Sequence, residues 1–298
     1  MVERDVTGDT SYDLPPQDPL RREELIVNVA LTGCVHSVDD NPALPWTPAD
    51  IAADARRCAD QGASIFHLHA RAHDGSPTME RIPIQQVVDA VRETVPGAIV
   101  CVSCSGRHDH EMIGRSGGLL YVEPRPEMAS LSLGSYNSFA SVIVNPPATI
   151  RSLALVMRER GVQPELECFE IGHIMHAHYL IAEGLLKPPY WFNLFLGNRG
   201  TAPALEWVLM NMRTLLPPVA IWAATGIGRF QYKVNRWAVN NGGQVRVGLE
   251  DSLWMDTKKE DPATNPRQVE RIVEYARELG REPVSVGRAR EILGMEEV

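Results

Sequence analysis

The sequence lacks any apolar run that approaches the roughly 20 residues of a membrane-spanning helix. It also lacks a basic and then apolar N-terminal segment, which is the pattern of a secretory signal peptide. Basic residues are in the minority, with 29 Lys and Arg against 38 Asp and Glu, which disfavours a nucleic-acid surface. We therefore expect a cytoplasmic protein without membrane or nucleic-acid partners.

Cysteine is scarce, and five residues in a chain of 298 do not form the disulfide framework of a small secreted protein. Cys101 and Cys104 have the spacing of a redox pair. Such a pair needs a helix N-terminus to lower the pKa of one thiol, whereas the run at 98–104 is apolar and typical of a strand. We interpret these two cysteines as structural.

Length, composition and pattern favour one α/β barrel, because 298 residues with 44% hydrophobic and 22% charged content suit that fold. Thr47, Pro48 and Asp50 are typical of a helix start. Eight short apolar runs, separated mostly by amphipathic helical stretches, are predicted strands: 25–32, 63–70, 98–104, 128–133, 165–170, 190–196, 218–224 and 244–250. Strands separated by helices pair in parallel through crossovers. We predict a single (β/α)8 TIM barrel over residues 23–298 after a flexible leader at 1–22, with a doubly wound open sheet as the alternative.

The pair of histidines in His67-Leu68-His69 lies within one predicted strand. Side chains at positions i and i+2 of a strand point to the same side, so both imidazoles lie on one face. Burying two such rings is costly unless partners satisfy them, and a divalent metal does so directly. Two histidines, one carboxylate and an open fourth position form the ligand set of a catalytic zinc site.

A carboxylate for this site is available near the other end of the chain. Closure of a barrel brings the eighth strand next to the first, and barrel enzymes carry their catalytic residues at the C-terminal ends of strands. Arg246 and Glu250 are four residues apart on one predicted strand and share a face, and Asp251 follows where the chain turns outward. Glu250 could bind the metal, and Asp251 could pair with Arg246.

Other histidines and tryptophans carry weaker signals. His176 and His178 are two apart on a predicted helix and do not share a face, so we predict no second metal site there. His173 follows a predicted strand end and could reach the barrel mouth. We expect Trp207, Trp222 and Trp237 to pack between helices and strands.

The run Gly226-Ile227-Gly228-Arg229 is a glycine-rich turn that leads into a helix. Such a turn suits contact with phosphate or pantetheine. It is not a full dinucleotide-binding fingerprint.

Seven runs carry a family resemblance: Leu31-Thr32-Gly33, Gly62-Ala63-Ser64-Ile65-Phe66-His67-Leu68-His69-Ala70-Arg71, Gly75-Ser76-Pro77-Thr78, Pro164-Glu165-Leu166-Glu167, Gly226-Ile227-Gly228-Arg229, Gly242-Gly243-Gln244-Val245-Arg246-Val247-Gly248-Leu249-Glu250-Asp251 and Ala289-Arg290-Glu291-Ile292-Leu293. They resemble the β-keto acid cleavage enzymes, once known only as a domain of unknown function, whose typical member is the 3-keto-5-aminohexanoate cleavage enzyme. The resemblance extends from about residue 25 to the C-terminus.

The resemblance implies a zinc-dependent barrel that condenses a β-keto acid with acetyl-CoA and releases acetoacetate and a new acyl-CoA through Claisen and retro-Claisen steps. The family's His-x-His motif falls on His67 and His69, and its Arg-x-x-x-Glu-Asp motif falls on Arg246, Glu250 and Asp251. This correspondence implies His67, His69 and Glu250 as zinc ligands, and Asp251, oriented by Arg246, as the base that takes a proton from acetyl-CoA. Zinc would act on the ketone as a Lewis acid.

The resemblance also assigns substrate contacts. The substrate-binding hydroxyls of the family fall on Ser103 and Ser135. The typical member has, at the position of Val35, a Glu that engages the substrate amine, so we do not expect 3-keto-5-aminohexanoate as the substrate here.

With CoA as the implied co-substrate, the glycine-rich turn predicts that Gly226, Gly228 and Arg229 contact it. Gln244 stands where the family often has His, which would alter contacts to CoA or around the metal ligands. The family's tendency implies a homotetramer.

Three other functions stay open at the level of sequence. A hydrolase of the amidohydrolase type also uses His-x-His in a barrel, but on the first strand. A class II type metal aldolase would work without CoA. A metal-stabilised scaffold would close its zinc site with four protein ligands, whereas Arg246 and Asp251 beside an open position favour catalysis.

Overall fold

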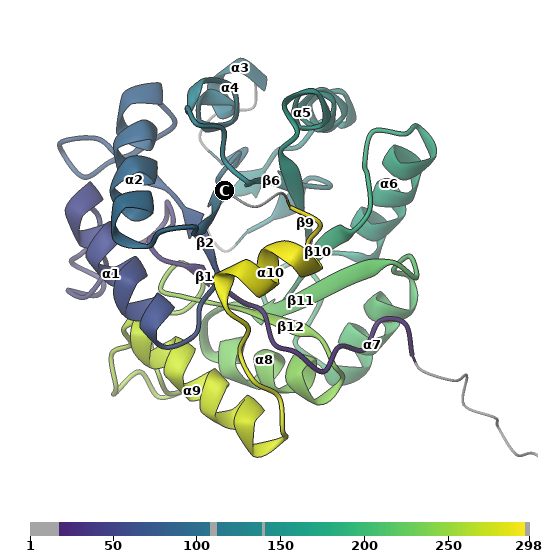
Figure 1. Cartoon of the computed structure of the whole chain (residues 1–298). Helices are drawn as coiled ribbons and strands as arrows, with labels where there is room; N and C mark the ends of the chain where they lie inside the picture. Colours follow the sequence, from purple (N-terminus) through teal and green to yellow (C-terminus); the bar gives the residue numbers. More distant parts are fainter. Residues whose placement is uncertain (1–17, 108–111, 139–140, 296–298) are drawn as a thin grey trace, which may run out of the picture.

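Eight parallel strands close into a barrel in the computed structural model, which describes residues 18–107, 112–138 and 141–295. Around the barrel the order is β1, β12, β11, β10, β9, β6, β5 and β2 (Figure 1). The strands are β1 (Val27–Ala30), β2 (Ile65–Leu68), β5 (Ile99–Val102), β6 (Met128–Ser132), β9 (Gln163–Cys168), β10 (Tyr190–Leu196), β11 (Ala220–Gly226) and β12 (Gln244–Val247). The predicted (β/α)8 fold is confirmed. The open sheet is wrong, because β1 pairs with both β2 and β12.

Helices surround the barrel, and none in the described ranges is long and apolar enough to cross a membrane. They are α1 (Pro48–Asp60), α2 (Arg81–Thr94), α3 (Met112–Arg115), α4 (Gly117–Tyr121), α5 (Pro147–Arg160), α6 (Ile171–Ala182), α7 (Glu206–Thr214), α8 (Gln231–Asn240), α9 (Asn265–Glu278) and α10 (Val286–Ile292), with a 3-10 turn, η1 (Gly228–Phe230), before α8. The predicted start of α1 is confirmed, because the Thr47 side chain accepts a hydrogen bond from the Asp50 N–H.

Strand alternation divides the core into two layers, as β2 illustrates. Phe66 and Leu68 point outward and pack in the layer between strands and helices. Ile65 belongs to the core inside the barrel, and His67, two residues on, points to the same side. The periodicity of two therefore carries the first histidine into the barrel.

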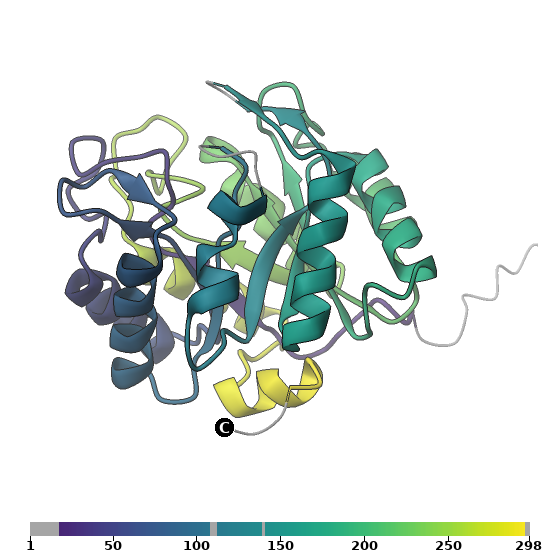
Figure 2. The same cartoon turned by 90° about the horizontal axis from the view of Figure 1, so that it is seen from above.

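The end of the barrel at which the strands begin is closed by apolar side chains and by α10. The inner core joins strand residues to the C-terminal segment: Ile26, Ile65, Ile99, Met128, Trp191 and Ile221 with Val284, Ala289 and Leu293. Figure 2 shows α10 at one end of the barrel and the hairpin β7 (Tyr136–Asn137) and β8 (Val142–Ile143) at the other. A second hairpin joins β3 (Ala70–Arg71) to β4 (Pro77–Thr78). With one end closed, access from solvent is left to the end where the strands finish.

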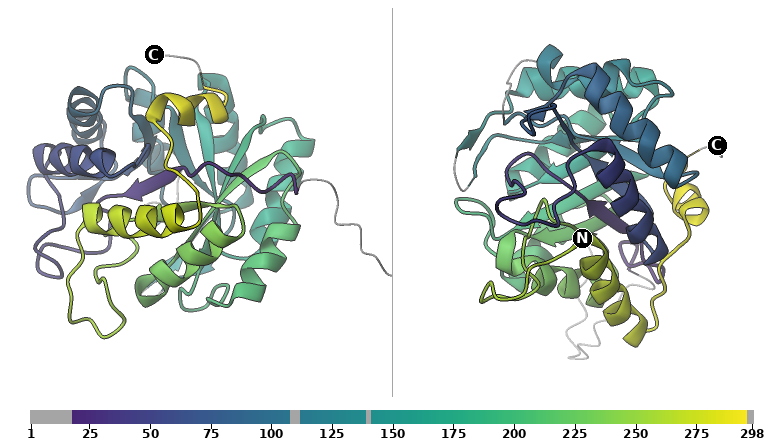
Figure 3. Two further views of the ribbon diagram at one scale, coloured as in Figure 1. Left: turned by 60° about the horizontal axis from the view of Figure 1, so that its bottom comes forward. Right: turned by 90° about the vertical axis from the view of Figure 1, so that its left-hand side faces the viewer.

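The segment before β1 crosses the closed end beside the connection between α9 and α10 (Figure 3). Leu25 forms a parallel bridge with Pro283, and the Trp222 indole N–H donates to the Leu20 carbonyl at 2.8 Å. Most of the predicted leader, residues 1–17, lies outside the described residues, so its flexibility stays a prediction.

Trp222 is buried as expected, but the expectation for Trp207 is wrong, because its side chain is 65% exposed.

Candidate active site

The two histidines of the motif lie at the C-terminal end of β2, inside the barrel mouth. His67 is on the strand and His69 follows it, and both side chains are buried. Their Nε2 atoms are 3.3 Å apart. Two imidazole nitrogens at this distance need a shared proton or a cation between them, because two lone pairs repel each other.

Glu250 reaches these rings through a turn and not, as predicted, from a strand. The strand β12 ends at Val247, and Gly248 has a φ of +135°. A Cβ at Gly248 would lie 2.1 Å from the Ala30 carbonyl oxygen, so only glycine allows the chain to bend over β1 here. The Glu250 N–H then donates to that same carbonyl at 3.2 Å. The turn directs the Glu250 side chain over the mouth.

The Glu250 carboxylate completes a cluster with the two histidines. Its Oε1 lies 3.4 Å from His69 Nε2, and its Oε2 lies 3.8 Å from His67 Nε2. Ligands at about 2.0–2.2 Å from a tetrahedral metal are roughly 3.3–3.6 Å apart. Glu250 Oε2 is buried and has no hydrogen-bond partner among the described residues. The three side chains therefore fit a divalent cation.

Glu165 fixes the orientation of His67 and was not predicted as a site residue. Its Oε2 lies 2.7 Å from His67 Nδ1, while the Asn28 and Asn193 amides donate to its Oε1 at 2.7 and 3.1 Å. Burial alone would raise the pKa of Glu165, but His67 and Arg246 outweigh it and lower the pKa to about 2. The ionised carboxylate keeps the proton on Nδ1 and leaves the Nε2 lone pair free for a metal.

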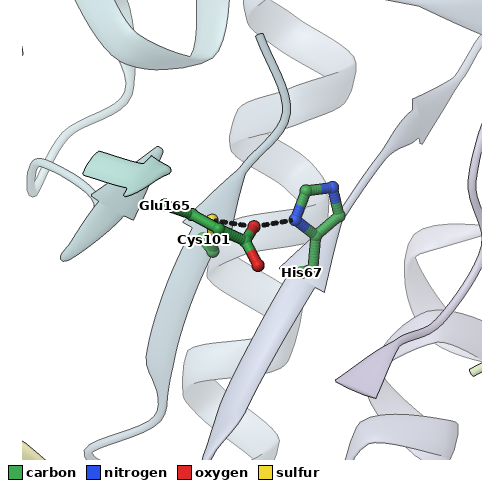
Figure 4. Close-up of side chains that lie close together, drawn as sticks. All are labelled: His67, Cys101 and Glu165. Carbon is green, nitrogen blue, oxygen red and sulfur yellow. Dashed lines mark hydrogen bonds and ion pairs between the residues drawn. The ribbon is translucent and has the colours of Figure 1, made fainter. Parts of the chain in front are cut away.

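Cys101 lies on the other side of the same carboxylate, with its Sγ 3.3 Å from Glu165 Oε2 (Figure 4). His67, Cys101 and Glu165 could in principle form a second ligand set. The 2.7 Å between His67 Nδ1 and Glu165 Oε2 is a hydrogen-bond distance, too short for two ligands of one ion. Burial also raises the pKa of the Cys101 thiol well above its usual value, so this trio is a hydrogen-bonded support for His67.

Arg246 is a buried cation surrounded by the acids of this mouth. Its Nε donates to Asp251 Oδ2 at 2.9 Å, and its Nη2 lies 3.1 Å from Glu250 Oε1. Its guanidinium stands over the Phe195 ring, 5.0 Å from the centroid. Burial alone would lower the pKa of Arg246, but the surrounding carboxylates raise it well above its usual value. The predicted Arg246–Asp251 pair is thus present in the structure.

Asp251 is held from two further sides. The Gly228 N–H donates to its main-chain carbonyl at 2.7 Å, and Thr225 Oγ1 lies 3.5 Å from its Oδ2. Burial raises the pKa of the Asp251 carboxyl against the pull of Arg246. The Gly228 N–H of the glycine-rich turn is therefore used to hold Asp251. The Arg229 side chain of the same turn is exposed to solvent.

Glu167 is a second acid that sequence reasoning missed. The Ser132 hydroxyl donates to its Oε2 at 2.6 Å, and Arg246 Nη1 lies 3.6 Å from its Oε1. Burial and the nearby Glu165 raise its pKa to about 7. A usable signal was present, because Glu165-Leu166-Glu167 repeats the spacing of His67-Leu68-His69 and also directs two polar groups to one face of a strand.

The predicted substrate hydroxyls lie on loops at the same end of the barrel. The Ser103 N–H donates to the Leu68 carbonyl at 3.2 Å, which holds Ser103 beside the histidines. Ser135 is exposed, and its Oγ accepts a hydrogen bond from the Asn145 N–H at 2.8 Å. Val35 is 52% exposed on the loop after β1.

Gln244, His176 and His178 lie apart from these groups. Gln244 begins β12, and its side chain accepts a hydrogen bond from the Ile26 N–H, so it contacts the end of the barrel opposite the mouth. His176 and His178 bond to the carbonyls of Leu133 and Leu215. These two rings satisfy backbone groups of different elements and form no shared ligand pair.

Comparison with known sequences identifies the family. The model of the β-keto acid cleavage enzymes matches residues 24–295. The chain belongs to the β-keto acid cleavage enzyme family. Within this family, it is 36% identical over 274 residues to a 3-keto-5-aminohexanoate cleavage enzyme of Fusobacterium nucleatum, covering 92% of this chain and 98% of that protein. It is 34% identical to a 3-oxoadipate:acetyl-CoA acetyltransferase of Cupriavidus necator, covering 91% and 94% of the two chains.

Solved structures show the same fold. The apo structure of ObcA superposes with a TM-score of 0.75 at 21% sequence identity. The match covers 85% of this chain and 66% of ObcA, so this chain spans about two thirds of the length of that protein. ObcA has also been solved as a ternary complex with a C4-CoA adduct and oxalate.

Proposed function

We propose that this protein is a metal-dependent β-keto acid cleavage enzyme that uses acetyl-CoA as its second substrate. In the proposed reaction the bond between C2 and C3 of R–CO–CH2–COO⁻ breaks. The acetyl group of acetyl-CoA joins the CH2–COO⁻ fragment as acetoacetate, and the R–CO fragment leaves as a new acyl-CoA. The strongest support is the meeting of His67, His69 and Glu250 at ligand spacing beside the Arg246–Asp251 pair, in a chain of this family.

His67, His69 and Glu250 are the proposed ligands of a zinc ion. The nitrogen-rich set favours zinc over magnesium or calcium. A bound cation would polarise the ketone of the β-keto acid as a Lewis acid. Its charge would also balance the acids of the mouth, because Glu165, Glu250 and Asp251 all surround the guanidinium of Arg246.

Asp251 is the proposed base that takes a proton from C2 of the β-keto acid. This replaces the expected deprotonation of acetyl-CoA, because the methyl group of acetyl-CoA is retained intact in acetoacetate, whereas C2 forms the new bond to the acetyl carbonyl and displaces the CoA thiolate, which then attacks the R–CO carbonyl. Its Oδ2 accepts a hydrogen bond from Arg246 Nε at 2.9 Å, which fixes the direction of the carboxylate. Arg246 is itself held by Glu250, by the Phe195 ring and by burial. The base is thus pre-oriented, which lowers the entropic cost of bringing it to the reacting carbon.

Substrate contacts complete the proposal. Ser103 and Ser135 would donate hydrogen bonds to the keto acid or to the condensed product, and Val35 would contact its side chain. Gly226, Gly228 and Arg229 would lie along CoA, with Arg229 as the cation for its phosphates.

The decisive experiment is to incubate the zinc-loaded protein with a panel of β-keto acids and [13C2]acetyl-CoA. We expect label in acetoacetate and one new acyl-CoA for each acid accepted, both detected by mass spectrometry. Cleavage that does not require acetyl-CoA would instead support the aldolase or hydrolase alternative. His69→Ala should lose bound zinc and turnover together, whereas full activity without metal would contradict the ligand assignment.

A homotetramer is part of the proposal on family grounds alone. Light scattering coupled to gel filtration measures the assembly directly. A monomeric mass for the active, zinc-loaded protein would contradict it.

A further inference from the structure

One cation at the mouth has no acidic partner among the described residues. Arg107 lies on the loop after β5, which is at the C-terminal end of the barrel, and its side chain is half-buried. Its Nη1 donates to the hydroxyls of Ser138 and Ser141, both at 3.1 Å. These neutral acceptors hold the guanidinium in place and leave its charge uncompensated.

Three titratable groups on which Arg107 acts, Cys34, His36 and Tyr136, are neutral as well. Burial raises the pKa of the Cys34 thiol, which hydrogen-bonds to Arg107, to about 11. Burial lowers the pKa of His36 and raises that of Tyr136, so both stay uncharged at neutral pH. Asp40, on the same loop as Cys34 and His36, accepts hydrogen bonds from the Ser37 main chain and hydroxyl.

Arg107 is also close to the proposed metal ligands. A Cβ at Gly33 would lie 2.6 Å from Glu250 Cγ, so the backbone just before Cys34 packs directly on Glu250. Arg71 bonds to the carbonyls of Gly33 and His36 and holds this loop in place. Arg107 hydrogen-bonds to Cys34, and the residue before it, Gly33, packs on Glu250, so this loop connects the guanidinium to the ligand cluster.

Three stacked aromatic rings lie between Arg246 and Arg107. Tyr136 stacks on Phe169 with ring centroids 3.8 Å apart, and Phe169 stacks on Phe195 at 4.3 Å. At the inner end of these three stacked rings, Arg246 lies over Phe195. At the outer end, the charge of Arg107 acts on the Tyr136 hydroxyl. A substrate that reacts beside Arg246 could lay a methylene chain along these rings and extend its far end to Arg107.

We propose that Arg107 binds a carboxylate at the distal end of the substrate, so that the enzyme acts on β-keto dicarboxylic acids. The proposal rests on the proposed function and names its substrate class. A guanidinium suits this task because it can donate two parallel hydrogen bonds to one carboxylate. The bonds from Nη1 to the two serines hold the guanidinium in place, and its hydrogen bond to Cys34 is to a neutral thiol, a weak acceptor that a carboxylate would replace.

The test compares two keto acids of six carbons, 3-oxoadipate and 3-oxohexanoate, which differ at the distal end in carrying a carboxylate or a methyl group. We expect the wild-type protein to prefer 3-oxoadipate in kcat/KM by about 10- to 100-fold, the usual worth of a hydrogen bond to a charged group. Arg107→Gln should remove this preference and leave the rate with 3-oxohexanoate little changed. Arg107→Lys should restore part of it.

A matched control is Arg151→Gln, which removes a guanidinium on α5 that pairs with the exposed Glu183. It should leave both substrates unaffected. Equal loss on the two keto acids in Arg107→Gln would overturn the proposal, because Arg107 would then bind the carboxylate that all β-keto acids share. A defect confined to the KM for acetyl-CoA would also overturn it and assign Arg107 to a CoA phosphate.

Failure of the proposed function is distinguishable from failure of this inference. If no keto acid turns over with acetyl-CoA, calorimetric binding of the two acids to the zinc-loaded protein still measures the recognition. If the wild-type protein binds 3-oxoadipate more tightly than 3-oxohexanoate and Arg107→Gln abolishes this difference, the role of Arg107 is supported even though the proposed reaction is not. Equal binding of both acids would refute it.

Discussion

Glu165→Gln is the sharpest perturbation of the proposed metal centre, because it changes a group that touches no metal. The substitution preserves the shape of a side chain that accepts hydrogen bonds from His67, Asn28 and Asn193. Since the pKa of Glu165 is about 2, the carboxylate is charged at neutral and mildly acidic pH. The substitution by Gln removes that charge. An amide also turns a donor group toward neighbours that are themselves donors.

The expected loss of zinc affinity follows from the role of Glu165 as the hydrogen-bond partner of His67. Loss of the group that orients a ligating histidine typically lowers metal affinity by about 10- to 100-fold. That corresponds to about 1.4–2.7 kcal/mol of binding free energy. The effect on His67 is amplified here because its ring is fully buried and has no solvent to replace the lost acceptor.

The measurement is zinc affinity by competition with a chromogenic chelator, together with urea unfolding of the metal-free protein to check that the variant folds. Glu167→Gln is the matched control, since Glu167 lies two residues away on β9 but accepts its hydrogen bond from Ser132, whereas Glu165 is the acid that bonds to His67. We expect the zinc affinity of the control to change far less than that of Glu165→Gln. Equal zinc affinity in wild type and a folded Glu165→Gln variant would refute the reasoning.

Three further outcomes are expected. Asp251→Asn should keep zinc and fold but lose turnover by about 10²- to 10⁴-fold, and a near-normal kcat would remove Asp251 from the reaction. Removal of zinc by a chelator should abolish activity but leave the far-ultraviolet circular dichroism and the cooperative unfolding transition in place, because the hydrophobic core does not include the metal ligands. Unfolding on chelation would instead support the scaffold alternative. His173 is buried, its Nδ1 accepts the Phe169 N–H at 3.2 Å, and burial lowers its pKa to about 4. Between pH 6.5 and 4 the unfolded chain binds a proton that the folded chain does not, so stability falls on acidification by up to about 3 kcal/mol. Urea unfolding at pH 7 and pH 4.5 should show a weaker acid effect in His173→Gln, and an unchanged pH dependence would exclude His173 as its source.

Local periodicity was sufficient to predict the barrel and the histidine pair. Apolar runs of strand length, separated by helical stretches, predict parallel pairing, because each crossover returns the chain to the same end of the sheet. The i and i+2 positions of His67 and His69 place both rings on one face by strand geometry alone. The same rule applied to Glu165 and Glu167 would have identified two more polar groups inside the barrel. These features depend on residues close together in the chain.

What only the tertiary structure decided is which of these groups meet. Glu165 is 98 residues from His67, and Arg246 is 179 residues from it, and no local pattern relates such positions. Glu250 was predicted on a strand, yet it reaches the site through the bend at Gly248, where close contact with Ala30 admits no side chain. Partner choice of this kind depends on strand register and barrel closure, which are cooperative properties of the whole packed chain.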